Sequence, residues 1–381
     1  MHYLDHAATT PVLPEVRDEM LVHLTEDFGN PASVHSFGRR AKEAVEDARD
    51  RVAQAVGASP AEITFTGGGT EADNLALKGI ARKRRGNGKH IVVTSFEHHA
   101  VLDTAHWLQD EGYAVTYLPV PPNGVVDPDE VAAAVRSDTS VVSVMAVNNE
   151  IGTIQPLNEI VGAVKRVNAS TAVHTDAVQA LGNIPVDLTS WGVDAAAFSA
   201  HKLGGPKGVG ALFARSGVAI ESQLHGGGQE RGLRSGTLNV AGIAGFGVAA
   251  EIAAKEVHDK GERLRPLRDR LLQSVREMFP DVTVNGDLDR RVPGNLNVAI
   301  PGAEGEIMLL LLDRAGIACS SGSACASGAL DPSHVLMALG LSKELADGSL
   351  RFSLGRSSTS EDVDALLRAL PEAVAGARRA A

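Results

Sequence analysis

Short apolar runs that alternate with helical patterns are the feature that most constrains how this chain can fold. Turn residues bound each run, and stretches with helical spacing, such as Val131–Val135 and Ile160–Val167, separate most of them. The runs are Glu62–Phe65, Ile91–Thr94, Val115–Leu118, Val141–Val147, Ala172–Thr175, Ala195–Ser199 and Val209–Phe213. Strands that alternate with helices form a mostly parallel sheet covered on both faces, so the pattern predicts an α/β fold whose sheet ends near Ala214.

The rest of the chain predicts a second, smaller α+β unit. A charged stretch with helical spacing, Glu251–Met278, is typical of a long connecting helix. Before it lies a glycine-rich segment, Gly226–Gly247, whose last glycines lack the order of a dinucleotide-binding loop and predict close helix packing. No linker rich in Pro or Ser separates the two units, so we expect them to pack closely.

Composition narrows the possible functions. The 381 residues are 44% hydrophobic and 22% charged, which suffices for a large core without disulfides. The net charge, 36 − 47 = −11, argues against nucleic acid or an anionic membrane as the main partner. The basic run Arg82–Arg85 is interpreted as a solvated helix end. Because the N-terminus is polar and no apolar stretch reaches membrane-spanning length, we expect a cytoplasmic protein.

Two strands of the predicted sheet end in residues suited to a cofactor. Lys202 follows the run Ala195–Ser199, at the sheet edge where α/β proteins bind ligands, and a desolvated lysine there can form a Schiff base. Asp176 follows Ala172–Thr175 and could hold a protonated heterocyclic nitrogen. The plainer alternatives are a surface lysine in a loop and a helix N-cap, and the N-cap role is compatible with the cofactor role.

A phosphate and a planar ring are suggested by two further segments. Thr66–Glu71 contains Gly67-Gly68-Gly69-Thr70 between a strand and a helix, so backbone N–H groups could bind a phosphate, although a plain turn is the alternative. It is neither a Walker A loop nor a dinucleotide fingerprint, which favours a mononucleotide-sized cofactor. His98, in Glu97-His98-His99, could stack on such a ring and move protons, and the spacing disfavours a metal site.

The last two segments suggest a nucleophile and an anion site. Cys325 lies among small residues in Ser320–Gly328, where an accessible thiol can attack and carry a group, although an inert loop cysteine is the alternative. Cys319, the other cysteine, is interpreted as a packed thiol, and the pair makes no disulfide framework or structural zinc site. Arg351 in Leu350–Arg356 needs an anion, either a substrate carboxylate or a structural partner. Together the six segments fit pyridoxal 5′-phosphate acting on an amino acid, with an added thiol.

With these residues in view, the sequence resembles the class V aminotransferase-like cysteine desulfurases of the NifS/IscS type. The segments that carry the resemblance run in family order over nearly the whole chain. They are Tyr3–Pro11, Phe28–Ser33, Phe65–Asn74, Glu97–Asp103, Val147–Gly152, Ser199–Lys202, Gly226–Arg231, Arg234–Thr237, Ser320–Cys325 and Arg351–Arg356.

The resemblance implies a role for each matching residue. Lys202 would carry the cofactor covalently, and Cys325 would attack the substrate sulfur to give a persulfide and alanine. His98 would stack on the ring and assist proton transfer. The remaining cofactor contacts would come from Asp176 to the ring nitrogen, Gln179 and Asn149 to the ring oxygen, Gly69, Thr70, Ser199 and His201 to the phosphate, and Thr237 to the phosphate of the other subunit. Arg351 would bind the substrate carboxylate, and Asn149 would contact the substrate if it does not contact the ring oxygen.

The same resemblance implies the architecture and the partners. It implies the fold type I of pyridoxal-phosphate enzymes, with a seven-stranded, mostly parallel sheet in a large domain at 15–257. A small α+β domain would combine 1–14 with 258–381. We expect a homodimer that uses L-cysteine and passes sulfur to an acceptor protein, such as an iron–sulfur scaffold or a thiolation enzyme. The acceptor, the role of Cys319 and a transient iron–sulfur cluster at Cys325 stay open.

Two other functions stay open on the sequence alone. A selenocysteine lyase or another class V pyridoxal-phosphate enzyme would share the fold without needing Cys325. A sulfur carrier that has lost catalysis would not need Lys202, Asp176 and His98, which are all present.

Overall fold

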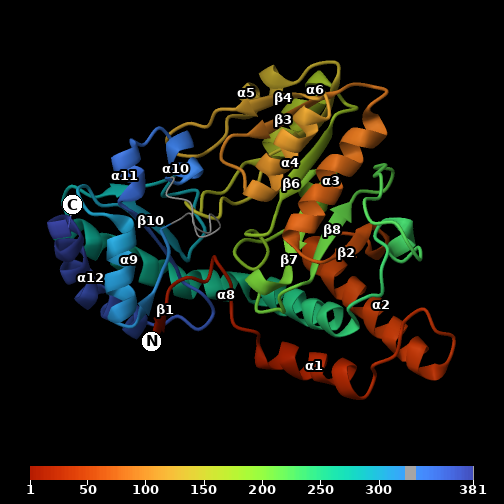
Figure 1. Ribbon diagram of the computed structural model, residues 1–381, viewed down its shortest axis with the longest axis horizontal. Helices are drawn as coiled ribbons and strands as arrows, with labels where there is room; N and C mark the ends of the chain where they lie inside the picture. The colour runs from red at the N-terminus through yellow and green to blue at the C-terminus, as the bar shows by residue number, and fades with distance from the viewer. Residues whose placement is uncertain (322–331, 381) are drawn as a thin grey trace.

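A seven-stranded sheet occupies the middle of the chain in the computed structural model, which describes residues 1–321 and 332–380 (Figure 1). Its strands are β2 (Ile63–Thr66), β3 (His90–Thr94), β4 (Ala114–Leu118), β5 (Thr139–Ser143), β6 (Ala172–Asp176), β7 (Ala195–Ser199) and β8 (Gly210–Ala214), in the spatial order β2-β8-β7-β6-β5-β3-β4. β8 runs antiparallel to β2 and β7, and the other pairs are parallel. The predicted mostly parallel α/β sheet is therefore confirmed.

The apolar runs of the sequence become strands that are buried on both faces, except at the edge of the sheet, where β4 is partly exposed. Along β3, Ile91 and Val93 belong to one core and Val92 to the other, as the two-residue period of a strand requires. The predicted run Val141–Val147 is longer than β5, which ends at Ser143. Beyond that point the chain stays buried beside β6, with Val144 N donating to His174 O, so its apolar residues mark burial rather than strand.

Helices cover both faces of this sheet. The first face is covered by α3 (Gly69–Arg84) and α4 (His99–Asp110). The second is covered by α2 (Ser36–Val56), α5 (Pro128–Ala134), α6 (Leu157–Val167), α7 (Leu188–Trp191) and the start of α8 (Val240–Met278). The two apolar cores on either side of the sheet bury nearly all of every strand except the edge strand β4, which fixes the positions of the buried strands' carboxyl ends.

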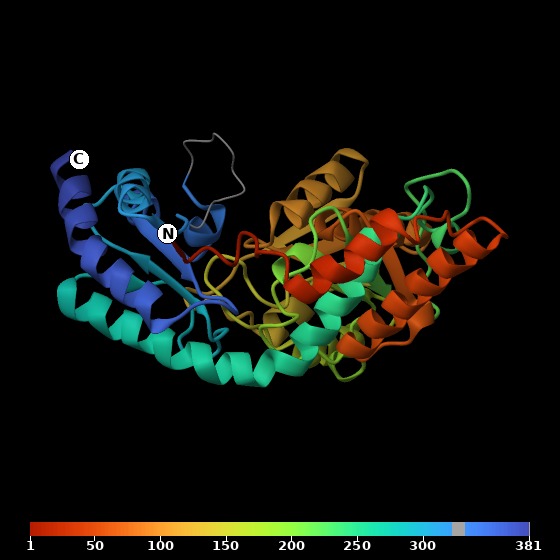
Figure 2. The same cartoon turned by 90° about the horizontal axis from the view of Figure 1, so that it is seen from below.

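The long connecting helix, α8, passes beneath both halves of the molecule (Figure 2). It begins at Val240, earlier than the predicted Glu251, because Asn239 caps it by accepting a hydrogen bond from Gly242 N. The glycines of this first part do pack closely against other helices, as predicted. An ideal Cβ on Gly247 would lie 2.7 Å from Ala48 Cα in α2. One on Gly245 would lie 2.7 Å from Met20 in α1 (Pro14–Thr25).

A further core is built from the two ends of the chain. The strands β9 (Thr283–Val284), β10 (Asn295–Ala299) and β12 (Ser349–Ser353) form an antiparallel sheet, and α9 (Gly305–Arg314) and α12 (Ser360–Ala380) pack with it. Leu4 lies in this core, and β1 (His2–Tyr3) pairs with β11 (Ile317–Ala318). The short helices α10 (His334–Ala338) and α11 (Lys343–Asp347) contribute Val335 and Ala346 to the core of the large sheet instead. The domain bounds 1–14, 15–257 and 258–381 stay a prediction.

Across the described residues, no helix combines the length and the hydropathy needed to cross a membrane.

Candidate active site

Ten of the residues singled out in the sequence line one cavity of about 320 Å³. They are Gly69, Thr70, His98, Asn149, Asp176, Gln179, Ser199, His201, Lys202 and Arg351. Asp176 and Ser199 are the last residues of β6 and β7, and His98 and Asn149 follow β3 and β5. The cavity therefore lies at the carboxyl ends of the parallel strands, where such sheets bind ligands.

One end of the cavity is suited to an anion. Gly69 begins α3, so the free N–H groups and the positive dipole end of a 16-residue helix face this region. An ideal Cβ on Gly69 would lie 2.6 Å from Val178, so the glycine lets the helix end approach closely. His201 lies nearby, with Nδ1 3.1 Å from Thr9 Oγ1, and burial together with the Lys202 charge lowers its pKa to about 4. A neutral imidazole there can donate a hydrogen bond to a phosphate without placing a second positive charge beside Lys202.

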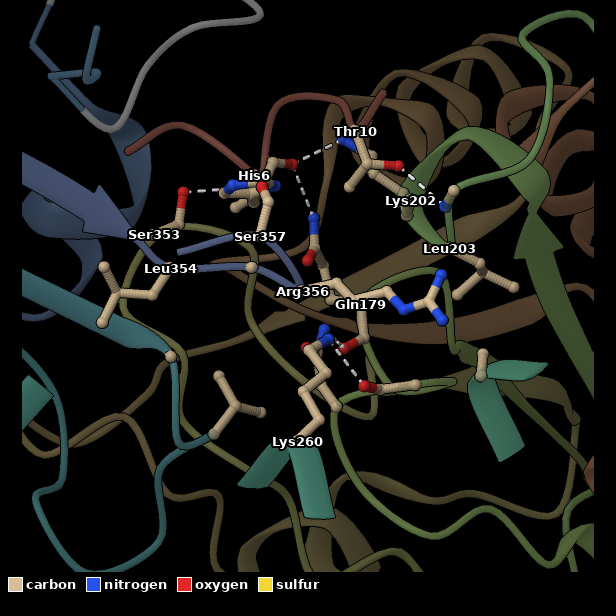
Figure 3. A pocket seen from close by; sticks show the side chains of 18 of the residues that line it. His6, Thr10, Gln179, Lys202, Leu203, Lys260, Ser353, Leu354, Arg356 and Ser357 are labelled. Atoms are coloured by element: carbon tan, nitrogen blue, oxygen red, sulfur yellow. Dashed lines mark hydrogen bonds between the residues drawn. The ribbon is translucent and has the colours of Figure 1, made fainter. Parts of the chain in front are cut away.

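The N-terminal segment lines the cavity with Ala7 and Ala8 and engages its lysine, as seen in Figure 3 from the side of an adjoining pocket. Lys202 Nζ donates to the carbonyl oxygens of Ala7 and Ala8 at 2.6 and 2.7 Å. Gln179 Nε2 donates to the same Ala7 oxygen at 2.9 Å. Lys202 is thus held in the cavity rather than in a surface loop, which was the plainer alternative.

Asp176 is buried at the end of β6 and accepts a hydrogen bond from Val178 N at 2.9 Å. This bond caps a turn, and no helix follows within residues 177–184, so the alternative prediction of a helix N-cap is wrong. Burial raises the pKa of Asp176, and the charges of His98 and Lys202 oppose that rise. The carboxylate is therefore placed to accept from a protonated ring nitrogen inside the cavity.

Two more carboxyl groups lie behind Asp176. Asp73, from α3, also lines the cavity, and its Oδ1 lies 3.4 Å from His174 Nε2 with both side chains fully buried. Burial and the neighbouring Asp176 and Glu97 raise the pKa of Asp73 well above its usual value. Burial raises the pKa of Glu97 to about 8, although its Oε1 accepts from Thr94 and from a backbone N–H. Burial and these neighbours therefore favour the protonated forms of Asp73 and Glu97, whereas the charges of His98 and Lys202 favour the ionised form of Asp176.

The two adjacent histidines, His98 and His99, lie in different surroundings. His98 caps α4, with Nδ1 accepting from Ala100 N at 3.1 Å, and it lines the cavity. His99 is turned outward, with Nδ1 3.4 Å from Asp103 and its ring 4.6 Å from that of His334. Among the described residues, no group of three or more His, Cys, Asp or Glu is arranged to hold a metal ion.

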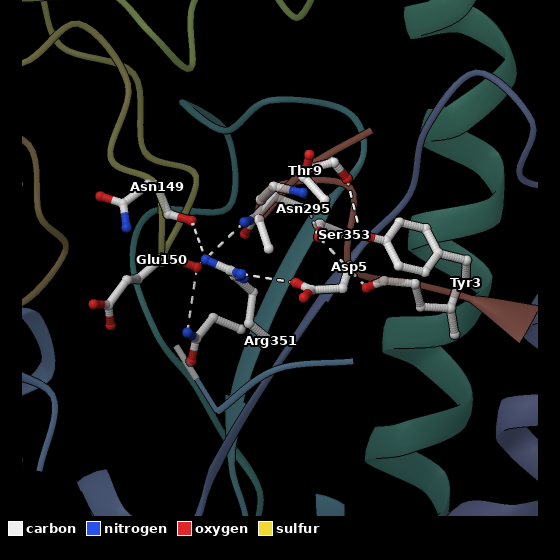
Figure 4. A network of polar contacts seen from close by, with 12 residues as sticks. Tyr3, Asp5, Thr9, Asn149, Glu150, Asn295, Arg351 and Ser353 are labelled. Carbon is white, nitrogen blue, oxygen red and sulfur yellow. Dashed lines mark hydrogen bonds and ion pairs between the residues drawn. The ribbon is translucent and has the colours of Figure 1, made fainter. Parts of the chain in front are cut away.

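Arg351 is held at the cavity by two partners (Figure 4). Its guanidinium donates to Asn149 O at 2.9 Å and pairs with Asp5 at 2.8 Å. The residue is 2% exposed, yet its Nε makes no hydrogen bond within the described structure, and neither does Asn149 Oδ1. The structural ion pair that was the plainer alternative is therefore present. Arg351 Nε and Asn149 Oδ1 are still available to a ligand.

The remaining candidates lie elsewhere. Cys325 lies outside the described residues. Cys319 is partly buried against the core built from the two ends of the chain, in agreement with a packed thiol, and burial with the nearby Asp5 raises its thiol pKa to about 12. Thr237 is exposed and lines a different hollow, with Asn30 and Glu230.

Sequence reasoning missed the polar residues that support the cavity. Asp73 stands among the buried residues of α3, and a carboxylate on an apolar helix face was the available signal. His174 precedes Asp176 by two residues in β6, so both side chains point to the same face of the sheet. Asp5 and Glu150 gave no such signal, because their partners Arg351 and Ser333 lie far away in sequence.

Comparison with known proteins identifies the family and the relatives of this chain. A model of the aminotransferase class-V family matches residues 2–366. The cysteine desulfurase IscS of Clostridium botulinum strain Hall is 50% identical over 374 residues, which cover 98% of this chain and 94% of the relative.

Solved structures agree with that match. A NifS-like protein is 41% identical with a TM-score of 0.93, and the match covers 98% of this chain and 100% of that one. SspA, solved in complex with cysteine, is 33% identical with a TM-score of 0.82, and the match covers 93% of this chain and 99% of that one.

Proposed function

This chain belongs to the aminotransferase class-V family, and from its 50% identity to a cysteine desulfurase over 374 residues we infer that it is a cysteine desulfurase. It converts L-cysteine to L-alanine, and we propose that the sulfur is kept as a persulfide on Cys325. The observation that carries the proposal is the single cavity in which Lys202, Asp176 and Arg351 converge. The identity of about half over nearly the full length to a cysteine desulfurase supports the same substrate.

The residues of the cavity fit pyridoxal 5′-phosphate, on which this family depends. The free N–H groups at the start of α3 suit a phosphate, and the Asp176 carboxyl group lines the cavity where it would bind the ring nitrogen. Asn149 Oδ1 is buried without a hydrogen-bond partner in the described structure, as expected for an atom that faces a ligand. When bound, the cofactor acts as an electron sink that weakens the Cα–H and Cβ–S bonds of cysteine.

The chain would hold the cofactor from several sides. Lys202 would anchor it covalently, and His98 would stack on the ring and move a proton near the substrate Cα. Polar contacts would come from Asp176 to the ring nitrogen, Gln179 and Asn149 to the ring oxygen, and Gly69, Thr70, Ser199 and His201 to the phosphate. Ala7 O, which now accepts from Lys202 and Gln179, would release both donors.

Arg351 would orient the substrate through its carboxylate. The guanidinium is already fixed by Asp5 and by Asn149 O, and its Nε has no partner among the described residues. A carboxylate bonded to Nε would therefore meet a preformed donor, at little cost in side-chain entropy.

The sulfur transfer balances without an added oxidant. The Cys325 thiolate attacks the substrate sulfur, the Cβ–S bond breaks, and a sulfur–sulfur bond forms. One L-cysteine and one Cys325 thiol give one L-alanine and one Cys325 persulfide, with the protons returned to the Cα, the Cβ and the solvent. A reductant or an acceptor thiol then removes the outer sulfur.

We also propose a cytoplasmic homodimer that delivers sulfur to a protein acceptor for iron–sulfur cluster assembly or thiolation. Six large apolar side chains of α1, the following segment and the start of α2 are exposed: Leu21, Val22, Leu24, Phe28, Val34 and Phe37. Asn30–Ala32, within this stretch, line the same hollow as Thr237, which we expect to reach the partner's phosphate. A Leu24→Asp variant should therefore become monomeric in analytical ultracentrifugation and bind the cofactor more weakly.

The test of the function is alanine and sulfide release from L-cysteine in the presence of a reductant. The wild type should release equal amounts of both, and Cys325→Ser should release almost none. Cys319→Ser is the matched control, because its thiol is packed away and should leave turnover unchanged.

Each result decides between functions. Full activity in Cys325→Ser would show that this thiol is not the nucleophile and would favour a lyase acting on selenocysteine. Retained turnover in Lys202→Ala would refute the assignment of the cofactor lysine. In that variant the yellow colour of the bound cofactor should also be lost.

A further inference from the structure

A second cavity, of about 340 Å³, adjoins the active site, and the proposed reaction gives it no role (Figure 3). The N-terminal segment 6–14 forms one wall, α8 forms another, and the loop 353–357 forms a third. Both cavities share Ala7, Asn149, Gln179 and Lys202 in their linings. Its volume is in the range of pockets that bind small organic molecules.

Lys260 brings a positive charge into this cavity from α8. Its Nζ donates to Gly182 O at 2.7 Å and to Asn183 Oδ1 at 2.9 Å, which are both neutral acceptors. No carboxylate of the described residues lies within 4 Å of the ammonium group. Desolvation and the Arg263 charge accordingly lower its pKa to about 8, with a small opposing effect from Glu256. A desolvated cation without a counter-anion is costly, so the site favours an anion.

His6 adds an unsatisfied polar group to the same cavity. The residue is 8% exposed, and neither ring nitrogen makes a hydrogen bond within the described structure. Burial and the charge of Lys260 lower its pKa to about 4, so the ring is neutral, with one donor and one acceptor. Buried polar atoms are nearly always bonded, so this ring also indicates a ligand with polar atoms.

The other walls define the rest of the ligand. Leu13, Leu203, Val292 and Leu354 line the cavity with apolar surface. Arg356 lines it too, but its guanidinium already pairs with Glu256 at 2.8 Å. The anion-binding group is therefore Lys260, and the remainder of the cavity suits an apolar body.

We propose that this cavity is a second binding site, for a small monocarboxylate with an apolar body whose carboxylate binds Lys260. The site communicates with the active site through Ala7, whose carbonyl accepts from Gln179 and Lys202. A ligand in contact with His6 presses on the residue next to that carbonyl. This communication rests on the proposed function, whereas binding itself does not.

The experiment titrates 4-methylpentanoate into the holoenzyme by isothermal calorimetry, in the absence of cysteine. We expect saturable binding to the wild type, and about ten- to hundredfold weaker binding to Lys260→Met, since a charge-assisted hydrogen bond is lost. Lys255→Met is the matched control, because Lys255 is an exposed lysine of the same helix and pairs with Glu251. It should bind as the wild type does.

A second variant keeps the test independent of the charge. Ile252→Trp fills the cavity from α8 without removing Lys260 and should abolish binding, while circular dichroism confirms its fold. Equal binding to Lys260→Met and the wild type, displaced by L-alanine, would place the probe in the active site and overturn the proposal. Absence of binding to the wild type at 50 mM probe, about five times a 10 mM Kd, would overturn it as well. Because no turnover is measured, failure of the proposed function would leave these results unchanged.

Discussion

Replacing Asp176 with Asn should weaken pyridoxal 5′-phosphate binding far more than replacing Asp73 with Asn, although both residues line the cavity. The positive charges of His98 and Lys202 act on Asp176, whereas the groups that act on Asp73 are the carboxyls of Asp176 and Glu97. These charges favour the ionised form of Asp176 and oppose ionisation of Asp73. An ionised partner is worth about 1.5–3 kcal/mol, or about 10- to 150-fold in affinity.

The assay is titration of the apoenzyme with the cofactor, followed by visible absorbance. Asp176→Asn should raise the Kd about 10- to 150-fold, and Asp73→Asn should change it by less than about threefold, because Asn matches a neutral acid in shape and charge. Circular dichroism and thermal unfolding check that both variants fold. An equal loss in the two variants, or full affinity in Asp176→Asn, would refute this distribution of charge.

Three further predictions concern stability. Glu230→Gln should lower the free energy of unfolding by about 1.5–3 kcal/mol in urea titrations, because it removes the buried carboxylate that binds the Arg49 guanidinium at 2.8 and 2.9 Å and leaves only the exposed Glu46 carboxylate beside it; a loss below about 1 kcal/mol would contradict this. Gly247→Leu should cost about 1–3 kcal/mol, since its Cβ would begin 2.7 Å from the Ala48 backbone, and an unchanged melting temperature would argue against that contact. Burial lowers the pKa of His174 to about 3, so the unfolded chain takes up a proton below about pH 6.5 that the folded chain refuses. This residue therefore lowers the free energy of unfolding by about 2 kcal/mol at pH 5 relative to pH 7. In urea titrations at the two pH values, the loss of unfolding free energy between pH 7 and pH 5 should be about 2 kcal/mol smaller in His174→Gln than in the wild type.

The sheet and the cavity residues could be predicted because their signals are local. A buried parallel strand is a short apolar run, and its functional residue follows directly, as Lys202 follows β7. The start of α8 was missed because glycines usually weaken helices, whereas here they admit α1 and α2.

The polar partners of the cavity residues could not be predicted from local sequence patterns. Arg351 suggested an anion, but its partner Asp5 lies 346 residues away. The pairing of Asp73 with His174 depends on how α3 crosses the sheet, which no local pattern specifies. The second cavity is likewise made by three segments that meet only in the folded chain.

The first residues of the chain find their partners among the last ones. His2 and Tyr3 pair with Ile317 and Ala318, and Ala7 N donates to Ser353, while Ala7 O accepts from Lys202. During synthesis the segment 2–10 emerges from the ribosome long before β11 and β12, so it stays without these contacts until those strands follow. The large sheet can thus form on the nascent chain, whereas the cavity that holds Lys202 closes only once Arg351 has emerged. A nascent chain arrested before residue 351 therefore lacks part of the wall of this cavity.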